Sequence, residues 1–228
     1  MAFTGIKTAC VIVAHADDEI LGCGGTMARL SEQGAEVHVC FMTDGVGARG
    51  TIVEKLKKDR EEMARKSNKI IGTQFISFAS FPDNSMDSVP LLSIAQHIEK
   101  LISEHQPELI ITHHHSDLNI DHQITYRSVM TACRPQPGHT VKTILSMEVP
   151  SATNWSQQSP STQFQPNFFV DISKQKDKKL AALKAYDLEM RPFPHSRSYN
   201  AIEARNVLRG TDVGVPLAEA FQLVRHIQ

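Results

Sequence analysis

Four residues able to bind or activate a metal ion follow the first apolar segment of the chain. His15, Asp17, Asp18 and Glu19 come directly after the apolar residues 11–13, and functional side chains of parallel sheets gather at such strand ends. Imidazole and carboxylate together suit a divalent ion such as zinc, and catalytic zinc commonly takes three protein ligands. The segment predicts half of a metal site, although acidic turns are also common helix N-termini.

A second histidine-rich segment could supply the missing ligand. Residues 113–122 read His-His-His-Ser-Asp-Leu-Asn-Ile-Asp-His and follow the apolar residues 109–111. Three adjacent histidines alone would indicate a polar loop. Two loops of this composition at two strand ends can converge if the strands are neighbours, so their joint presence favours a metal site.

The composition is that of an ordinary globular protein. The 228 residues are 41% hydrophobic and 21% charged. Lys and Arg total 24 against 25 acidic residues, which argues against nucleic acid or anionic lipid as a partner. With no signal-peptide pattern and no long apolar run, we expect a cytoplasmic protein without a membrane span. A homo-oligomer is compatible with the sequence, which does not fix the oligomeric state. Buried thiols are expected at Cys10, Cys23, Cys40 and Cys133.

Apolar strands alternate with amphipathic helices over the first two thirds of the chain. This pattern predicts an α/β fold, Rossmann-like and doubly wound, with a mostly parallel sheet and helices on both faces. We expect one domain over residues 1–228, with the core in about 6–150 and a loop, a strand and helices in 151–228. The expected strands are 8–14, 36–42, 73–79, 108–112, 142–148 and 168–171, and the expected helices are 19–34, 51–71, 90–105, 120–133 and 173–188. The polar residues 151–166 are expected to form a surface loop near the site.

Several short motifs of the chain resemble those of a known protein family. His15-Ala16-Asp17-Asp18-Glu19 resembles the His-Pro-Asp-Asp-Glu signature of the PIG-L, or LmbE-like, family of zinc-dependent N-acetyl-sugar deacetylases. Asp117-Leu118-Asn119-Ile120-Asp121-His122 looks like the second motif of that family. Further matching segments occur in the family's order at 42–45, 60–62, 82–84 and 218–221. The resemblance covers most of the chain, and the combination of motifs is far more specific than any one of them.

The resemblance implies a role for each matching residue. It implies that His15, Asp18 and His122 bind one zinc ion per chain, that Asp17 is the general base, and that Asp121 orients an imidazole. Zinc lowers the pKa of bound water, and a carboxylate beside it must accept the proton and can return it to the departing amine. Adjacent acids can divide these tasks because their side chains diverge.

Two positions depart from the family pattern. Ala16 replaces the commoner proline, which removes no ligand. Asn119 stands where many relatives have a histidine that assists the tetrahedral intermediate, so another residue could take that role. We rank His195 first, because prolines precede it and stiffen its segment, and His115 second. His113 is a further candidate, and each of these histidines could equally be structural.

Contacts to the substrate are expected from loops. Arg49, Asp83 and Asn84 are the predicted substrate-binding residues, with Arg49 suited to a phosphate or a sugar hydroxyl. The sequence therefore predicts a zinc-dependent hydrolase that removes the acetyl group from an N-acetylated amino sugar of the N-acetylglucosamine type, free or conjugated. It does not identify the sugar, because specificity lies in loop conformations.

Two alternatives come from other functional classes. Residues 45–50 read Gly-Val-Gly-Ala-Arg-Gly and match the GxGxxG fingerprint of nicotinamide-dependent oxidoreductases. That fingerprint belongs on the first strand-to-helix turn, which here carries His15 and Asp18, so a rim of the pocket or a mobile loop is the better interpretation of these glycines. The second alternative is a relative that binds zinc without catalysis.

Overall fold

A single twisted sheet runs through the centre of the molecule. The computed structural model describes residues 3, 5–45 and 53–228. Within them the strands are β1 (Thr8–Val13), β2 (Glu36–Thr43), β3 (Phe75–Phe81), β4 (Leu109–Thr112), β5 (Thr143–Met147), β6 (Phe168–Asp171) and β7 (Ala218–His226). They form one sheet in the order β3-β2-β1-β4-β5-β7-β6. Strands β1 to β5 pair in parallel, and β7 runs antiparallel to both of its neighbours. The predicted α/β fold with a mostly parallel sheet is confirmed.

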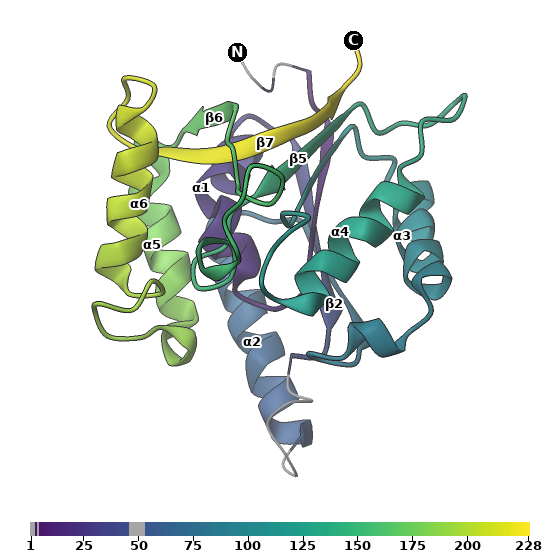
Figure 1. The fold of residues 1–228 in the computed structure, drawn as a ribbon, viewed down its shortest axis with the longest axis horizontal. Helices are drawn as coiled ribbons and strands as arrows, with labels where there is room; N and C mark the ends of the chain where they lie inside the picture. The colour runs from purple at the N-terminus through teal and green to yellow at the C-terminus, as the bar shows by residue number, and fades with distance from the viewer. Residues whose placement is uncertain (1–2, 4, 46–52) are drawn as a thin grey trace.

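Helices cover both faces of this sheet (Figure 1). They are α1 (Asp18–Glu32), α2 (Val53–Ile71), α3 (Leu91–His105), α4 (Ile120–Ala132), α5 (Lys176–Ala185) and α6 (Tyr199–Thr211). Strand β1 shows why a helix layer is needed on each face of the sheet, because its apolar side chains point alternately to the two faces. Val11 and Val13 belong to the core under α1, α2, α5 and α6, whereas Cys10 and Ile12 belong to the core under α3 and α4. No helix of the described residues is long and apolar enough to cross a membrane.

The last strand was not predicted from the sequence. The chain returns through α6 into β7, which inserts between β5 and β6 instead of extending an edge. Glu219 lies inside β7 and is buried, which hides the strand from a search for apolar runs. Its carboxylate accepts hydrogen bonds from the backbone N–H groups of Gly25 and Thr26, at 2.8 and 2.7 Å, close to the kink of α1 at Cys23.

The C-terminal third differs from the expectation in its boundaries. The single helix expected over 173–188 is α5 flanked by two short 3₁₀ turns, η4 (Ser173–Gln175) and η5 (Asp187–Glu189). The four cysteines are free and buried, as predicted. One domain over residues 1–228 stays a prediction, and it agrees with a sheet that draws strands from both halves of the chain.

The sheet order places the two histidine segments side by side. Strand β1 pairs with β2 on one side and with β4 on the other, so the chain reverses its winding direction between β1 and β4. Ligands of open α/β sheets bind in the crevice outside the carboxyl ends of two such strands. The segments 14–19 and 113–122 follow β1 and β4 at this crevice, and the backbone N–H of Ala14 donates to Nε2 of His113 at 2.8 Å.

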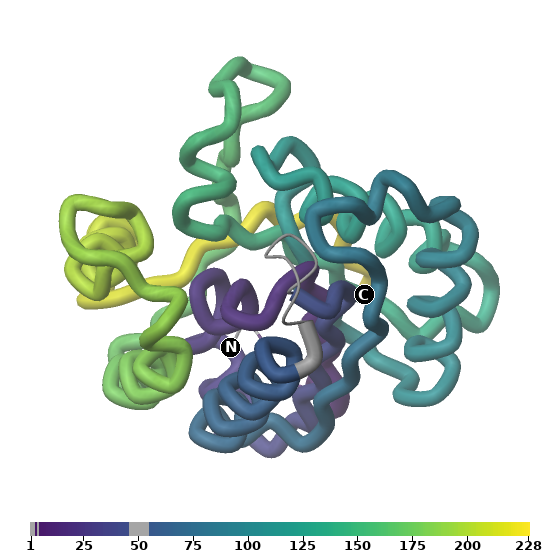
Figure 2. The backbone as a smooth tube through the Cα atoms, turned by 90° about the horizontal axis from the view of Figure 1, so that it is seen from below, coloured from purple at the N-terminus to yellow at the C-terminus, as the bar shows by residue number. Residues whose placement is uncertain are grey.

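The polar residues 151–166 stand out from the body of the molecule, as the green part of the tube in Figure 2 shows. They contain the short turn η3 (Thr153–Trp155) and lie beside the second histidine segment. Thr153 Oγ1 donates to Asp117 Oδ2 at 2.8 Å, and Nε2 of His114 is 2.9 Å from the carbonyl oxygen of Thr162. The expected loop therefore adjoins the candidate site.

Candidate metal centre and active site

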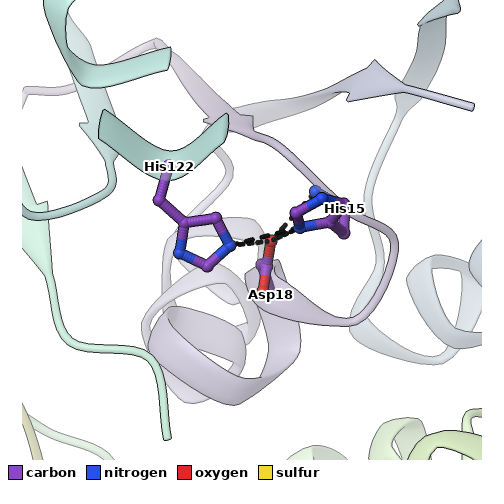
Figure 3. Close-up of side chains that lie close together, drawn as sticks. All are labelled: His15, Asp18 and His122. Carbon is purple, nitrogen blue, oxygen red and sulfur yellow. Dashed lines mark hydrogen bonds and ion pairs between the residues drawn. The ribbon is translucent and has the colours of Figure 1, made fainter. Parts of the chain in front are cut away.

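Three side chains point at one another at the carboxyl ends of β1 and β4 (Figure 3). Nδ1 of His15 lies 3.2 Å from Nε2 of His122, and Oδ2 of Asp18 lies 3.3 Å from the first atom and 3.2 Å from the second. The ligands of a tetrahedral zinc ion, each at roughly 2.0–2.1 Å, stand about 3.3 Å apart. All three residues are buried. The triangle of donor atoms therefore fits zinc in both chemistry and size.

A strained turn presents the first two of these side chains. Asp17, between β1 and α1, has φ 124°, a backbone conformation that residues other than glycine rarely adopt. The backbone N–H of His15 donates to Asp18 Oδ2 at 2.9 Å, which closes the turn. Strain of this kind persists only where the surroundings fix it, and it is typical of active sites. The turn directs His15 and Asp18 toward His122 and lets the Asp17 side chain point elsewhere.

His122, the third residue of the triangle, lies in the first turn of α4. Asn119 caps this helix, because its Oδ1 accepts the backbone N–H of Asp121 at 2.8 Å. Asp117 lies on the far side of His122, with Oδ2 3.1 Å from Nδ1. Asp117 had no predicted role, although its spacing from His122 within the second motif is a signal that could have found it.

Carboxylates also face the far nitrogen of His15. Nε2 of His15 is 3.1 Å from Asp121 Oδ2 and 3.2 Å from Asp83 Oδ1. Asp121 is itself fixed by the backbone N–H groups of Asn84 and Met86, at 2.6 and 3.0 Å. Metal-binding histidines usually direct their second nitrogen at a carboxylate, which fixes the ring and its tautomer. Asp121 therefore lies where a carboxylate can orient the His15 imidazole, and this role stays a prediction.

The electrostatics of the triangle suit a cation. Burial disfavours a charged His122, but Asp18 and Asp117 outweigh burial and raise the pKa of His122 to about 9. Burial also opposes charge on His15, yet Asp121 and Asp18 hold the pKa of that ring well above its usual value. Burial alone would raise the pKa of Asp18, whereas His122 and His15 hold it well below its usual range. The acidic side chains therefore attract positive charge to this point, from protons or from a metal ion.

Asp17 has a different set of neighbours. Its Oδ2 accepts a hydrogen bond from Nη1 of Arg197 at 2.8 Å, and Nε of Arg197 donates to Ser151 Oγ at 2.7 Å. Burial raises the pKa of Asp17 although Arg197 opposes the shift. A carboxylate with a raised pKa beside a metal centre is suited to accept a proton. Arg197 had no predicted role, although it lies two residues after the predicted His195.

A small cavity of about 150 Å³ opens beside the triangle. It is lined by His15, Asp17, Gly45, Arg60, Asp83, Asn84, Asn119, Glu189 and Arg197. The structure thus brings the predicted substrate-binding residues Asp83 and Asn84 to the site, together with Asn119. Arg60 and Glu189 had no predicted role, and their side chains form an ion pair at 3.3 Å. Predicted Arg49 and most of the glycine pattern at 45–50 lie outside the described residues.

The two histidines ranked for the catalytic role lie apart from the ligand triangle. His195 is half-buried, and its ring contacts Trp155 in a T-shaped pair with centroids 5.2 Å apart. His115 is exposed, with Nε2 3.2 Å from the carbonyl oxygen of Ser161. Neither belongs to the cavity lining. Their assignment to the tetrahedral intermediate stays a prediction, one that these positions do not favour.

His113 is closer to the metal centre. Its ring stacks on His122 with centroids 3.8 Å apart, and its Nε2 accepts the backbone N–H of Ala14. Burial, together with the charge of His122, lowers the pKa of His113 to about 3. We interpret His113 as a neutral, structural histidine that packs the ligand His122.

Fold and site together define a Rossmann-like α/β protein with a histidine and aspartate centre at its topological switch point. The family model described as PIG-L, GlcNAc-PI de-N-acetylase, matches residues 10–133, which contain the whole triangle. The uncharacterized deacetylase YaiS of Escherichia coli (strain K12) is 31% identical over 186 residues, 79% of this chain and 90% of that protein. The chain belongs to the PIG-L, or LmbE-like, deacetylase family, as the motifs predicted.

Similar proteins differ in the reactions for which they are named. The N,N'-diacetylchitobiose deacetylase from Pyrococcus horikoshii has the same fold, with a TM-score of 0.78, 20% identity and coverage of 98% of this chain and 85% of that one. The 4-oxalmesaconate hydratase of Pseudomonas putida is 26% identical over 196 residues, 78% of this chain and 72% of that protein. Membership of the family therefore does not by itself fix the reaction.

Proposed function

We propose that the protein is a zinc-dependent N-deacetylase that hydrolyses the acetamido group of an N-acetylglucosamine-type amino sugar, free or conjugated. The observation that carries the proposal is the triangle of His15 Nδ1, Asp18 Oδ2 and His122 Nε2, at 3.2–3.3 Å, with the separate carboxylate of Asp17 beside it. The deacetylases among its relatives support the same reaction.

The donor set supports zinc as the cofactor. Two imidazoles and one carboxylate are the kind of three-ligand set that catalytic zinc uses, and both imidazoles have a carboxylate at the second nitrogen. Bound zinc would act as a Lewis acid and would lower the pKa of water toward ~7. One zinc ion per chain would use His15, Asp18 and His122 as its three protein ligands.

The remaining steps fall to side chains of the chain itself. Asp17 takes the proton of the attacking water and passes it to the amine as the carbon–nitrogen bond breaks, so that acetate and the free amino sugar leave. Arg197 holds the Asp17 carboxylate through the 2.8 Å hydrogen bond, which fixes its direction. Asn119 and Asn84 line the cavity and offer amide groups to the substrate.

The size of the cavity favours recognition of one end of the substrate. A space of about 150 Å³ bounded by charged and amide groups suits the acetamido group and the adjoining part of a sugar ring. A conjugate would extend beyond it. Asp83, placed at the lining, is suited to accept hydrogen bonds from sugar hydroxyl groups.

The test combines metal analysis with an acetate-release assay. Protein purified without added metal should hold one zinc per chain, and it should release acetate from N-acetylglucosamine or its conjugates until a chelator removes the zinc. The substrate panel should include 4-oxalmesaconate, because a relative is named a hydratase of that compound. Hydration without acetate release, stoichiometric zinc without any turnover, or a response to a nicotinamide cofactor would each contradict the proposal.

A further inference from the structure

The single tryptophan of the chain lies two residues after Thr153, whose hydroxyl binds Asp117 in the candidate site, and the reaction proposed above does not use it. Trp155 is the last residue of the turn η3, and 52% of its surface is exposed. A large aromatic side chain is costly to leave in water. Two further exposed apolar side chains belong to segments that build the site: Leu118, between Asp117 and Asn119, and Phe193.

The backbone around Trp155 is fixed by contacts that lead to the metal centre. Thr153 Oγ1 accepts the backbone N–H of Val149 at 2.8 Å and donates to Asp117 Oδ2, the carboxylate behind His122. Asn154 Oδ1 accepts the backbone N–H of Ser151 at 2.8 Å. The turn that carries the indole is therefore tied to the same residues that position a metal ligand.

The indole is also fixed from the side of Asp17. Its ring meets His195 edge to face, with an interplanar angle of 75°. Nδ1 of His195 accepts the backbone N–H of Arg197 at 3.0 Å, and the guanidinium of Arg197 binds Asp17. Edge-to-face pairs hold aromatic rings in a defined relative orientation. Trp155 is thus a positioned, half-exposed aromatic surface connected to both halves of the site.

We propose that Trp155, backed by His195, is the binding subsite for a second, neutral ring joined to the N-acetylated sugar. A pyranose ring has one face made of C–H groups, which packs on an indole, and its hydroxyl groups stay in water at the exposed edge. The inference rests on the proposed function, and it narrows the substrate from amino sugars in general to glycosides.

The charges around the cavity favour a neutral ring over a phosphate. Both arginines of the described lining already have acidic partners: Arg197 binds Asp17 at 2.8 Å, and Arg60 binds Glu189 at 3.3 Å. A phosphate would have to compete with these carboxylates for the guanidinium groups. The apolar face of a neutral ring needs no guanidinium partner, and it can pack on the exposed surface of Trp155.

Substrate preference tests the proposal. We would measure kcat/KM for acetate release from N,N'-diacetylchitobiose, from N-acetylglucosamine and from N-acetylglucosamine 1-phosphate. The wild-type protein should prefer the disaccharide, and Trp155→Ala should lower the ratio of disaccharide to monosaccharide by about 10-fold, the size of one lost aromatic contact. An unchanged ratio, or a wild-type preference for the phosphate, would overturn the subsite.

Phe75→Ala is the matched control. Phe75 is 53% exposed and stacks on His38, with centroids 4.5 Å apart, much as Trp155 contacts His195. It begins β3, at the amino ends of the parallel strands, opposite to the candidate site. This variant loses an exposed aromatic ring paired with a histidine, and the substrate ratio should stay at the wild-type value.

Tryptophan fluorescence separates failure of the subsite from failure of the proposed function. Because Trp155 is the only tryptophan, its emission reports on this position alone. In the zinc-loaded Asp17→Asn variant, which should leave the substrate intact, N,N'-diacetylchitobiose should shift or quench the emission, and N-acetylglucosamine should change it less. If no sugar releases acetate from wild-type protein, the deacetylase assignment fails while this titration still reads binding. Unchanged emission at saturating disaccharide would contradict the subsite, whatever the activity assay shows.

Discussion

Asp17 and Asp18 are adjacent in the chain, yet their carboxylates belong to different networks. Asp18 Oδ2 lies 3.2 Å from Nε2 of His122, whereas Asp17 Oδ2 accepts a hydrogen bond from Arg197 at 2.8 Å. The strained backbone of Asp17, with φ 124°, separates the two directions. One turn of the chain can therefore provide both a metal ligand and an independent proton acceptor.

This division predicts opposite outcomes for two isosteric variants. Asp17→Asn should keep stoichiometric zinc and lose turnover by several orders of magnitude, because an amide cannot accept the proton of water. Asp18→Asn should weaken zinc binding, because it replaces a charged ligand by a neutral one. Elemental analysis and kcat on the same preparations would check both. Zinc lost from the Asp17 variant and retained by the Asp18 variant would reverse the assignment.

Asp117 should control how tightly His122 holds the metal. Its Oδ2 is 3.1 Å from Nδ1 of His122 and also accepts a hydrogen bond from Thr153. Asp117→Asn should lower zinc affinity about 10- to 100-fold, as is usual when a carboxylate behind a metal-binding histidine is removed. His122→Ala should abolish stoichiometric zinc. Competition with a chromogenic chelator would measure both.

His115→Ala supplies the control for these variants. His115 belongs to the same histidine-rich segment as His122, but its ring is exposed and contacts the carbonyl oxygen of Ser161. Its removal should leave zinc affinity at the wild-type value. One zinc per chain in the His122 variant would show that the third ligand is a different residue.

The parts of the site that could be predicted are those that follow strand ends. His15, Asp18 and His122 meet because β1 and β4 are neighbours, and acidic and histidine residues follow both strands. The alternation of strands and helices in the first two thirds of the chain likewise predicted the parallel sheet that brings these strand ends together. Local sequence was sufficient there, because the positions are set by the ends of regular elements.

Residues that reach the site from the C-terminal third could not be found in this way. Arg197 binds Asp17 from 180 positions away, and Thr153 reaches Asp117 from an irregular segment. Neither contact has a period or a motif in the sequence. The same holds for Glu219, whose carboxylate is buried inside β7 because it meets the backbone N–H groups of Gly25 and Thr26 in α1 and the Lys179 ammonium in α5. These positions depend on packing between distant segments.

Zinc and protons should compete for the triangle, which predicts a dependence on pH. In metal-free protein, the pKa of His122 is raised from 6.5 to about 9. A raised pKa stabilises the fold fully below the pKa of the unfolded chain, and this contribution is lost as the pH rises through the raised value. The Tm of chelator-treated protein should therefore fall between pH 6.5 and 9.

Zinc displaces these protons, so the gain in Tm on adding one equivalent of zinc should grow over the same interval. Asp18 and Asp117, whose pKa values are lowered, stay ionised throughout it and do not alter the sign. Scanning calorimetry with and without zinc at each pH separates the ligands from other buried groups such as Glu19, whose pKa burial raises to about 8. A zinc-dependent gain that is the same at pH 6.5 and at pH 9 would argue against His122 as a ligand.

Asn119 is the position where the chain departs from many of its relatives, and its surroundings predict how the acetyl carbonyl is held. It lines the cavity, its Oδ1 caps α4, and its Nδ2 donates to Asn84 Oδ1 at 3.1 Å. Both ends of the amide are therefore held in place at the cavity lining. Because a donor aimed at a developing oxyanion contributes strongly to kcat, Asn119→Ala should lower kcat by roughly 10²-fold while zinc content stays unchanged.

Asn119→Asp keeps an oxygen that can cap α4, but it replaces the amide donor by an acceptor and adds a negative charge, so it separates loss of the donor from loss of the helix cap. Its kcat should fall to a similar extent, with the Tm close to that of the wild-type protein. The histidines ranked from the sequence provide the comparison. If His195→Ala or His115→Ala lost 10²-fold in kcat and Asn119→Asp did not, the carbonyl would be polarised by a histidine after all. The cavity lining favours the asparagine, because Asn119 belongs to it and neither histidine does.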